Sequence, residues 1–171
     1  GRMTGNGRLR FIGEATINID PDARTLAEIA VQTAKVARRF GVQPKVAMLS
    51  FSNFGTSGEL RTDRIEEAIA IARELDPDLV IDGPMQADTA LVPEIQKDYP
   101  FMAFDGPANV LICPNLSAAN IAYKLLQRIA GAEMTGPILE GLSKPAHVLQ
   151  RGDSVRDVVH MAAICAVDAQ R

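Results

Sequence analysis

The chain has few of the side chains on which metal sites and disulfide frameworks depend. Among its 171 residues are two cysteines and two histidines, and none of the four stands at the spacing of zinc ligands. Cys113 and Cys165 both lie in apolar runs, which predicts two buried thiols in a reducing compartment rather than a disulfide. We therefore expect a cytoplasmic protein without a metal site.

Long apolar runs and an excess of basic charge are also missing. No apolar run approaches the roughly 18 to 20 residues of a membrane span, and the basic first residues, GRMTGNGRLR, lack the apolar stretch of a secretory signal. A formal net charge of -3 provides no positive field for nucleic acid or for an anionic membrane. The sequence therefore predicts neither of these partners.

Common catalytic and nucleotide-binding patterns are absent as well. The sequence contains neither a P-loop nor a GxGxxG loop. His147 and His160 have no serine or cysteine partner in a nucleophile motif, so a hydrolase triad is not expected.

What the sequence does contain is a regular alternation of strand and helix patterns. Its apolar fraction of 47% suffices for one core, and short apolar strands favour a mostly parallel sheet covered on both faces. We predict a single α/β domain over residues 1–171, with three layers and helices on both faces of the sheet. Strands are expected at Arg10–Asn18, Val46–Ser50, Leu79–Asp82, Asn109–Cys113, 137–139 and 146–150, and helices at Arg24–Phe40, Arg61–Leu75, Gln86–Glu94, Ser117–Ala130 and Val155–Gln170.

Two loops follow predicted strands at the edge where open α/β sheets bind their ligands. The loop that starts at Ser50 also contains Ser52, Asn53 and Gly55 and runs to about Ser57. Its hydroxyl and backbone N–H groups could hold an anion, although the same residue types make ordinary turns. Asp82, after the next strand, is either a catalytic carboxylate or the cap of the following helix.

Cations and a carboxylate lie in the last third of the chain. Lys124 and Arg128 share one helix face, which suits either an anion or a solvated surface. Arg151, between a predicted strand and a helix start, is a candidate phosphate contact. Asp157 stands three residues after Ser154, as in a capping box, which predicts a structural role for its carboxylate.

The order of these segments resembles the phosphate acetyl- and butyryltransferases, including the homologous domain fused to bacterial malic enzymes. The resemblance is colinear from Val46 to Asp168 and implies the C-terminal half of a phosphotransacetylase-like fold. Its motifs are LSFSNFG (49–55), DGPMQADTAL (82–91), GPANVLICPNLSAANIAYKLLQR (106–128), GPILEGLSKPAHVLQRG (136–152) and DVVHMAAICAVDAQ (157–170).

Three details place the chain closer to malic enzymes than to the free-standing transferases within this resemblance. NFG at 53–55 replaces the Thr-Lys-Gly-type sequence of the free-standing transferases. YPFMAFDGPANVL (99–111) and AHVLQRG (146–152) are similar to malic-enzyme tails. Gln150 stands where active transferases carry the serine that supports attack of the coenzyme A thiolate on acetyl phosphate, and a glutamine amide has no hydroxyl for that role.

The resemblance also implies a ligand. Arg151 and Asp157 match the arginine and the aspartate of the family's site, and Lys124 and Arg128 match positions that contact the anionic part of coenzyme A. Acetyl-CoA or CoA would thus bind through Lys124, Arg128, Gln150 and Arg151, with Ser50, Ser52, Asn53 and Gly55 near its acyl or phosphate end.

The function implied is that of a regulatory and oligomerisation domain at the C-terminus of an NADP-dependent malic enzyme. Acetyl-CoA would act as effector, and this segment would contribute no catalytic residue. NADP and a divalent metal would bind only in the separate malic domain. One alternative is a phosphate acetyltransferase that uses Arg151 and Asp157. A second is a purely structural dimerisation module.

The final predicted helix raises a question of its own. The family domain extends further than this chain, and its last helix packs with the earlier half. Val155–Gln170 is apolar around most of its circumference, which requires burial. We expect the segment 153–171 to dock on the same domain, on that other half or on a partner chain, and the protein to be a homo-oligomer, a dimer or larger.

Overall fold

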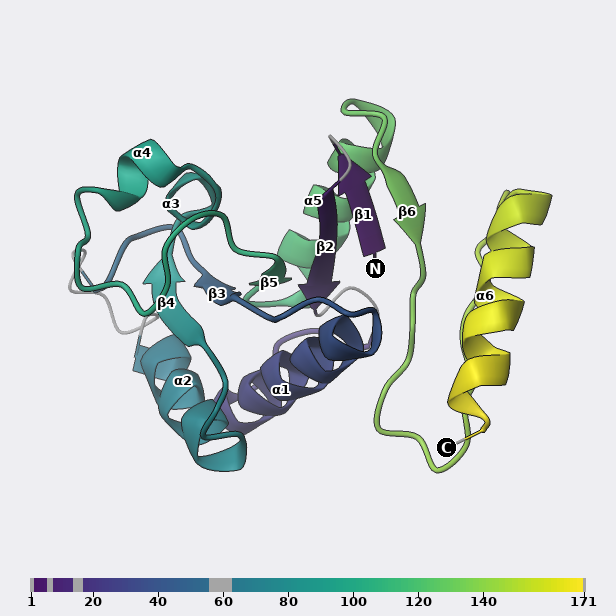
Figure 1. Ribbon diagram of the computed structural model, residues 1–171, viewed down its shortest axis with the longest axis horizontal. Helices are drawn as coiled ribbons and strands as arrows, with labels where there is room; N and C mark the ends of the chain where they lie inside the picture. The colour runs from purple at the N-terminus through teal and green to yellow at the C-terminus, as the bar shows by residue number, and fades with distance from the viewer. Residues whose placement is uncertain (1, 6–7, 14–16, 56–62, 171) are drawn as a thin grey trace.

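The computed structural model describes residues 2–5, 8–13, 17–55 and 63–170, and it confirms the predicted α/β class. The described strands form one sheet in the order β4-β3-β5-β2-β1-β6 (Figure 1). The strands are β1 (Arg2–Gly5), β2 (Arg8–Gly13), β3 (Val46–Leu49), β4 (Ile81–Met85), β5 (Val110–Ile112) and β6 (Glu133–Thr135). The helices are α1 (Ala23–Arg39), α2 (Asp63–Leu75), α3 (Ala87–Leu91), α4 (Pro93–Gln96), α5 (Leu116–Arg128) and α6 (Val155–Asp168).

The sheet is parallel at its centre and antiparallel at one side. β3 pairs in parallel with β4 and β5, and β5 pairs in parallel with β2. β1 pairs antiparallel with both β2 and β6. The sequence did not predict β1 or β6, which are too short to show a periodic pattern.

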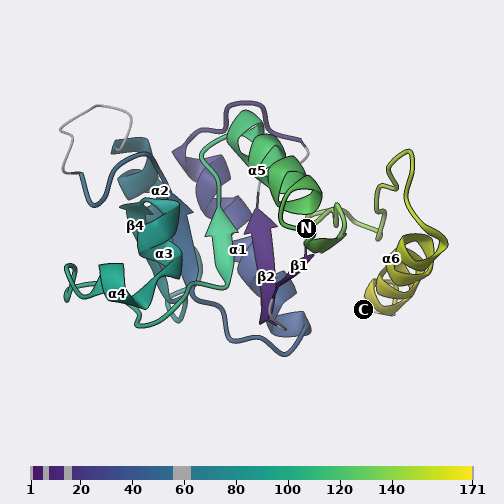
Figure 2. The same cartoon turned by 90° about the horizontal axis from the view of Figure 1, so that it is seen from above.

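Both faces of the central strands are buried, as predicted, because successive side chains point to opposite sides. In β3, Val46 and Met48 belong to the core beneath α1 and α2, whereas Ala47 belongs to a second core with Phe104 and Leu111. α5 closes a third cluster on that second face, and the view from above shows α1 and α5 on opposite sides of the strands (Figure 2). The three-layer arrangement is therefore confirmed.

The predicted helix at Arg24–Phe40 is confirmed to within one residue at each end by α1. The Asp22 carboxylate caps it by accepting a 2.8 Å hydrogen bond from the backbone N–H of Thr25. Gly41, whose φ of +73° suits a helix terminus, follows its last turn. None of the helices in the described ranges is long and apolar enough to cross a membrane.

The helix predicted at Gln86–Glu94 is instead two short helices, α3 and α4. Val92 lies between them in an extended conformation, with φ -111° and ψ 108°. A residue that precedes proline is disfavoured in the α region, so Pro93 ends one helix and starts the next. The proline was visible in the sequence, and its consequence was missed.

Three strand predictions need correction. The strand expected at Leu79–Asp82 lies slightly later, as β4, and the one expected at Arg10–Asn18 starts earlier and ends at Gly13, with residues 14–16 outside the described ranges. The strands expected at 137–139 and 146–150 are reduced to a single antiparallel bridge between Ile138 and His147. No neighbouring strand extends that bridge into a ladder within the described residues.

Helix α6 stands beside the layered part of the molecule in both views (Figures 1 and 2). Met161 is its buried residue, at 4% exposed, whereas Val155 is 82% and Val159 58% exposed. Much of the apolar surface of α6 is thus exposed in the described structure, and the docking predicted for the segment 153–171 stays a prediction. Cys165 on α6 is half-buried rather than buried, while Cys113 is buried, and the two cysteines form no disulfide.

Candidate functional site

Lys124 on α5 meets the segment that precedes α6. The Asn115 side chain fixes the start of α5 by accepting a 2.9 Å hydrogen bond from the backbone N–H of Ala118. Two turns later, the Lys124 ammonium donates to the Gln150 side-chain oxygen at 3.3 Å. The structure thus brings together two of the residues that the resemblance assigns to ligand binding, although they lie 26 positions apart.

Tyr123 lies at the centre of this arrangement and was not predicted. Its side chain is only 8% exposed, and its phenol lies near enough to the Gln150 side chain to interact with it. Burial is the largest cause that raises the pKa of Tyr123 above its ordinary value, and the negative charges of Asp153 and Asp157 add to it. The sequence feature that could have indicated its burial is its spacing of four from Ala119, because this spacing places both residues on the inner face of α5.

This raised pKa has a measurable consequence at high pH. A phenol whose pKa is higher in the folded state contributes full stability below its unfolded pKa of about 10, and that contribution is lost as the pH rises further. We expect the stability of the wild-type chain to fall more steeply with alkaline pH than that of Tyr123→Phe, measured by urea unfolding at several pH values. Parallel alkaline declines would contradict the environment described for Tyr123.

The cations around Gln150 are accessible. Arg128 is the last residue of α5 and is exposed, and it is near enough to Tyr123 to lower the pKa of that phenol slightly. Arg151 is exposed and makes no ion pair with the residues that the structure describes. A tight turn closed by Gln150 N–H donating to Asp153 at 2.7 Å carries Arg151. Three exposed cations thus lie on the two segments that the Lys124–Gln150 contact joins: Lys124 and Arg128 on α5, and Arg151 next to Gln150.

The structural role predicted for Asp157 is confirmed. Its carboxylate accepts from the Ser154 hydroxyl at 2.6 Å and from the Ser154 backbone N–H at 2.9 Å, and the Ser154 hydroxyl accepts from Asp157 N–H. These bonds to Ser154 lower the pKa of Asp157 below its ordinary value. The carboxylate is therefore ionised at neutral pH and fixed at the start of α6.

The loop at 50–55 is held by the neighbouring strand β4 and helix α3. Ser50 N–H donates to Met85 O at 2.8 Å, and Phe54 N–H donates to Pro84 O at 2.7 Å. The Asn53 amide donates to the Tyr99 hydroxyl at 3.1 Å and accepts from Gln86 N–H at 2.8 Å. Because these N–H donors already have partners within the protein, the described part of the loop is held in place without a ligand. Residues 56–57 of the predicted loop lie outside the described residues.

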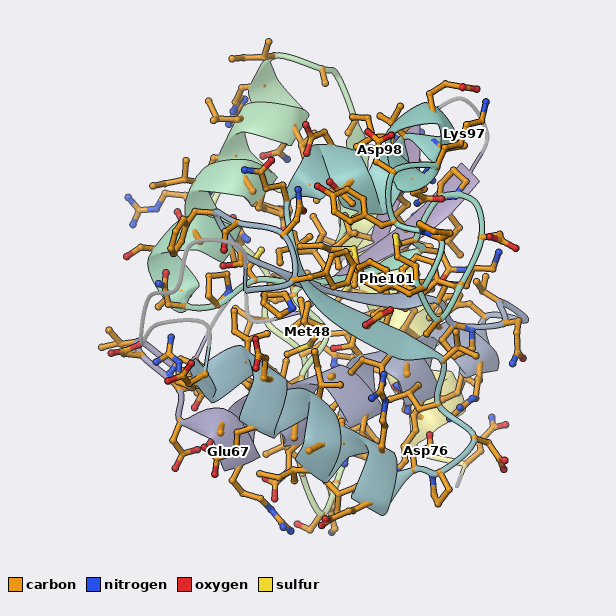
Figure 3. The ribbon with its side chains drawn as sticks, turned by 90° about the vertical axis from the view of Figure 1, so that its left-hand side faces the viewer. Met48, Glu67, Asp76, Lys97, Asp98 and Phe101 are labelled. Carbon is orange, nitrogen blue, oxygen red and sulfur yellow. The ribbon has the colours of Figure 1, made fainter. Side chains whose placement is uncertain are left out.

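Aromatic rings brace the same loop from outside. The Phe54 ring lies 5.2 Å from that of Tyr99 and 4.9 Å from that of Phe101, centroid to centroid. Phe101 is 66% exposed and is labelled near the centre of the face shown in Figure 3. Ser52, within the same loop, is buried. The direct roles predicted for Ser50, Ser52, Asn53 and Gly55 toward a ligand stay predictions.

The capping role predicted for Asp82 is wrong, whereas the catalytic alternative stays a prediction. It lies within β4, where its carboxylate accepts from Gly83 N–H at 2.9 Å and from Ala103 N–H at 2.7 Å. The helix that follows begins at Ala87, and its N-cap residue is Gln86, which makes no side-chain cap. Asp82 therefore ties the loop around Ala103 to the edge of the sheet.

Two cavities in the described structure lie away from the Lys124–Gln150 contact. A cavity of about 590 Å³ lies between α1 and the segment 137–141, and it includes none of the predicted ligand-binding residues. A smaller one, of about 270 Å³, is lined by Gln127, Arg156, Asp157 and His160, among others. None of the residues predicted to bind coenzyme A lines either of these two cavities.

Comparisons with known proteins agree with this arrangement. The chain is 48% identical over 163 residues to an NADP-dependent malic enzyme of Salmonella typhimurium, covering 94% of this chain and 21% of that protein. It is 45% identical over 168 residues to a phosphate acetyltransferase of Corynebacterium glutamicum, covering 98% of this chain and 51% of that protein. The chain thus spans a fifth to a half of these relatives.

The fold has a close counterpart among solved structures. A phosphotransacetylase from Streptococcus pyogenes superposes with a TM-score of 0.93 at 42% identity, covering 99% of this chain and 52% of that one. The family model for phosphate acetyl/butaryl transferase matches residues 2–166. Because that match takes in nearly the whole chain, the chain belongs to the phosphate acetyl/butaryl transferase family.

Proposed function

We propose that this chain is the acetyl-CoA-binding regulatory part of a malic enzyme and has no acyltransferase activity of its own. The observation that carries the proposal is the contact between Lys124 and Gln150, with Arg128 one turn along α5 and Arg151 next to Gln150 in the chain, both exposed. Such a group suits the phosphates of coenzyme A, because charge-assisted hydrogen bonds to phosphate are strong. Gln150 takes the place of the hydroxyl that the transferases use.

Sequence identity does not separate the two functions, since it is 48% to the malic enzyme and 45% to the phosphate acetyltransferase. The chemistry at Gln150 is what favours the regulatory function. Its side-chain oxygen accepts from Lys124, so the amide is held in the site without a group that could assist a thiolate.

Regulation would follow from differential binding. Acetyl-CoA can shift the arrangement of an oligomer only if it binds one arrangement more tightly than another. The exposed apolar residues of α6 support association with another part of the protein or with a second subunit, since such a surface is unfavourable in water. The oligomer, the cytoplasmic location and the binding of NADP and a divalent metal in a separate malic domain belong to this proposal.

The test is a calorimetric titration with acetyl-CoA, together with an assay for acetyl-CoA formation from acetyl phosphate and CoA in the full-length protein. We expect saturable binding and no transferase activity. Activity of the wild-type protein would favour the acyltransferase, in which Arg151 stabilises the acyl phosphate and Asp157 accepts the thiol proton. Absence of binding would favour a purely structural module.

Gln150→Ser in the full-length protein tests whether restoring a hydroxyl at this position restores transferase activity. If Gln150 alone keeps the site inactive, the variant gains transferase activity while acetyl-CoA binding persists. A variant that binds acetyl-CoA and stays inactive would show that further groups of the transferase site are missing.

A further inference from the structure

Four polar side chains from three separate parts of the chain meet at the far end of α6. They are Arg39 at the end of α1, Glu140 and His147 in the segment between β6 and α6, and Asp168 at the end of α6. Arg39 forms an ion pair with Glu140 and lies 3.5 Å from an Asp168 oxygen, and His147 Nε2 lies 3.4 Å from the other Asp168 oxygen. We call these residues the Arg39 cluster.

The Arg39 cluster is largely shielded from water. The side chain of His147 is 4% exposed and that of Asp168 13%, while Arg39 and Glu140 are 23% and 21% exposed. Leu139 N–H donates to His147 Nδ1 at 3.3 Å, which leaves the ring hydrogen on Nε2, facing Asp168. The contact at Nε2 is too long for a good hydrogen bond, whereas the guanidinium of Arg39 is a cationic partner of Asp168.

Other described attachments of α6 are weak. Met161 is its buried residue, and the Arg156–Glu133 ion pair has side chains 60% and 65% exposed, where such a pair contributes little. The Cys165 thiol contacts Pro145 O at 3.8 Å, a weak interaction. The position of α6 relative to the sheet therefore depends strongly on the Arg39 cluster.

Electrostatics makes Arg39 the key member. One guanidinium faces two carboxylates from different segments, Glu140 and Asp168. Without it, both carboxylates lose a shared cation in a partly buried place, which weakens the attachment of α6 to α1 and to the segment around Glu140.

We infer that Arg39 is a positioning residue that holds α6 and the segment around His147 in the arrangement where Gln150 meets Lys124. α6 begins at Val155, where Ser154 and Asp157 form a capping box, and it ends at Asp168. Because the helix is continuous, a displacement of its Asp168 end also moves its first turn, which follows the candidate site in the chain. The effect on α6 stands on geometry alone, and the effect on acetyl-CoA rests on the proposed function.

The experiment compares Arg39→Gln with Arg39→Lys and with Arg24→Gln, a matched loss of a cation from the exposed Arg24–Glu28 pair on the same helix. Hydrogen exchange followed by mass spectrometry reports on α6 and, as a check of folding, on β3 and β5. In Arg39→Gln we expect protection of α6 amides to fall about tenfold or more while the central strands keep theirs. Arg24→Gln should match the wild type, and Arg39→Lys should retain much of the protection.

Acetyl-CoA titration of the same variants tests the link to the site, with a loss of about threefold or more in affinity expected for Arg39→Gln alone. Unchanged exchange of α6 in Arg39→Gln would overturn the inference, whether or not acetyl-CoA binds. Loosened α6 with unchanged affinity would overturn the link to the ligand site. If the wild-type chain fails to bind acetyl-CoA, the proposed function fails, and the exchange result still decides the role of Arg39.

Discussion

Replacement of Lys124 by alanine is expected to weaken acetyl-CoA binding about tenfold, and the double variant Lys124→Ala/Arg128→Ala about a hundredfold. A hydrogen bond between charged groups contributes roughly 1.5–3 kcal/mol, and 1.4 kcal/mol corresponds to a factor of ten in affinity. The two side chains lie one turn apart on α5, so they can address neighbouring phosphates. Calorimetric titration at fixed ionic strength measures both constants.

Lys97→Ala provides the matched control for this series. Lys97 is also an exposed lysine, it pairs only with Glu94 on α4 among the described residues, and Figure 3 shows it at a corner of the molecule away from α5. The substitution removes the same charge, so it corrects for any general effect of net charge on an anionic ligand. Equal losses in Lys97→Ala and Lys124→Ala would show that α5 does not form the binding site.

Salt dependence adds a second readout. If Lys124 and Arg128 contact phosphates, raising the salt concentration should weaken binding to the wild type more than to the double variant, because screening acts on the charges that were removed. The alanine variants should unfold at the same urea concentration as the wild type, since both side chains are exposed.

Much of the fold could be predicted because its signals are local. The buried stripe of α1 repeats at helical spacing, and the apolar runs of β3 and β5 indicate strands covered on both faces. β6 gave no such signal, because Glu133–Thr135 is a strand only through its pairing with β1. Propensity in a short strand is set by its neighbours, which one sequence does not display.

The candidate site was predictable only in part, for the same reason. The family resemblance pointed to Lys124, Gln150 and Arg151, and the structure shows that the first two touch. It could not show that Tyr123 underlies them or that Asn53 is engaged by Tyr99. Such contacts depend on tertiary packing rather than on spacing along the chain.

Gly83 supports the second large prediction, which concerns stability. It lies in β4 with a φ of +141°, a conformation that L residues rarely adopt. A Cβ atom added there would lie 2.6 Å from the Met48 carbonyl oxygen, and backbone cannot easily give way. We expect Gly83→Ala to lower the free energy of unfolding by about 3 kcal/mol or more, from strain of about 1–3 kcal/mol and crowding of similar size.

Gly41→Ala separates the two causes. Gly41 also has a positive φ, of +73°, but nothing lies within 4 Å of its added Cβ. It should therefore show only the backbone penalty, roughly 1 kcal/mol. Urea unfolding of the two variants beside the wild type gives the comparison, and equal losses would mean that the contact between Gly83 and Met48 is not tight in solution.

Gly83→Ala is also expected to affect the loop at 50–55. Pro84 and Met85, the next two residues of β4, accept the hydrogen bonds that fix Phe54 and Ser50. A shift of β4 away from the Met48 carbonyl would lengthen those bonds and free the loop before the core of α1 and α2 is affected. Hydrogen exchange in Gly83→Ala should therefore rise first at Ser50 and Phe54, whereas in Gly41→Ala it should not.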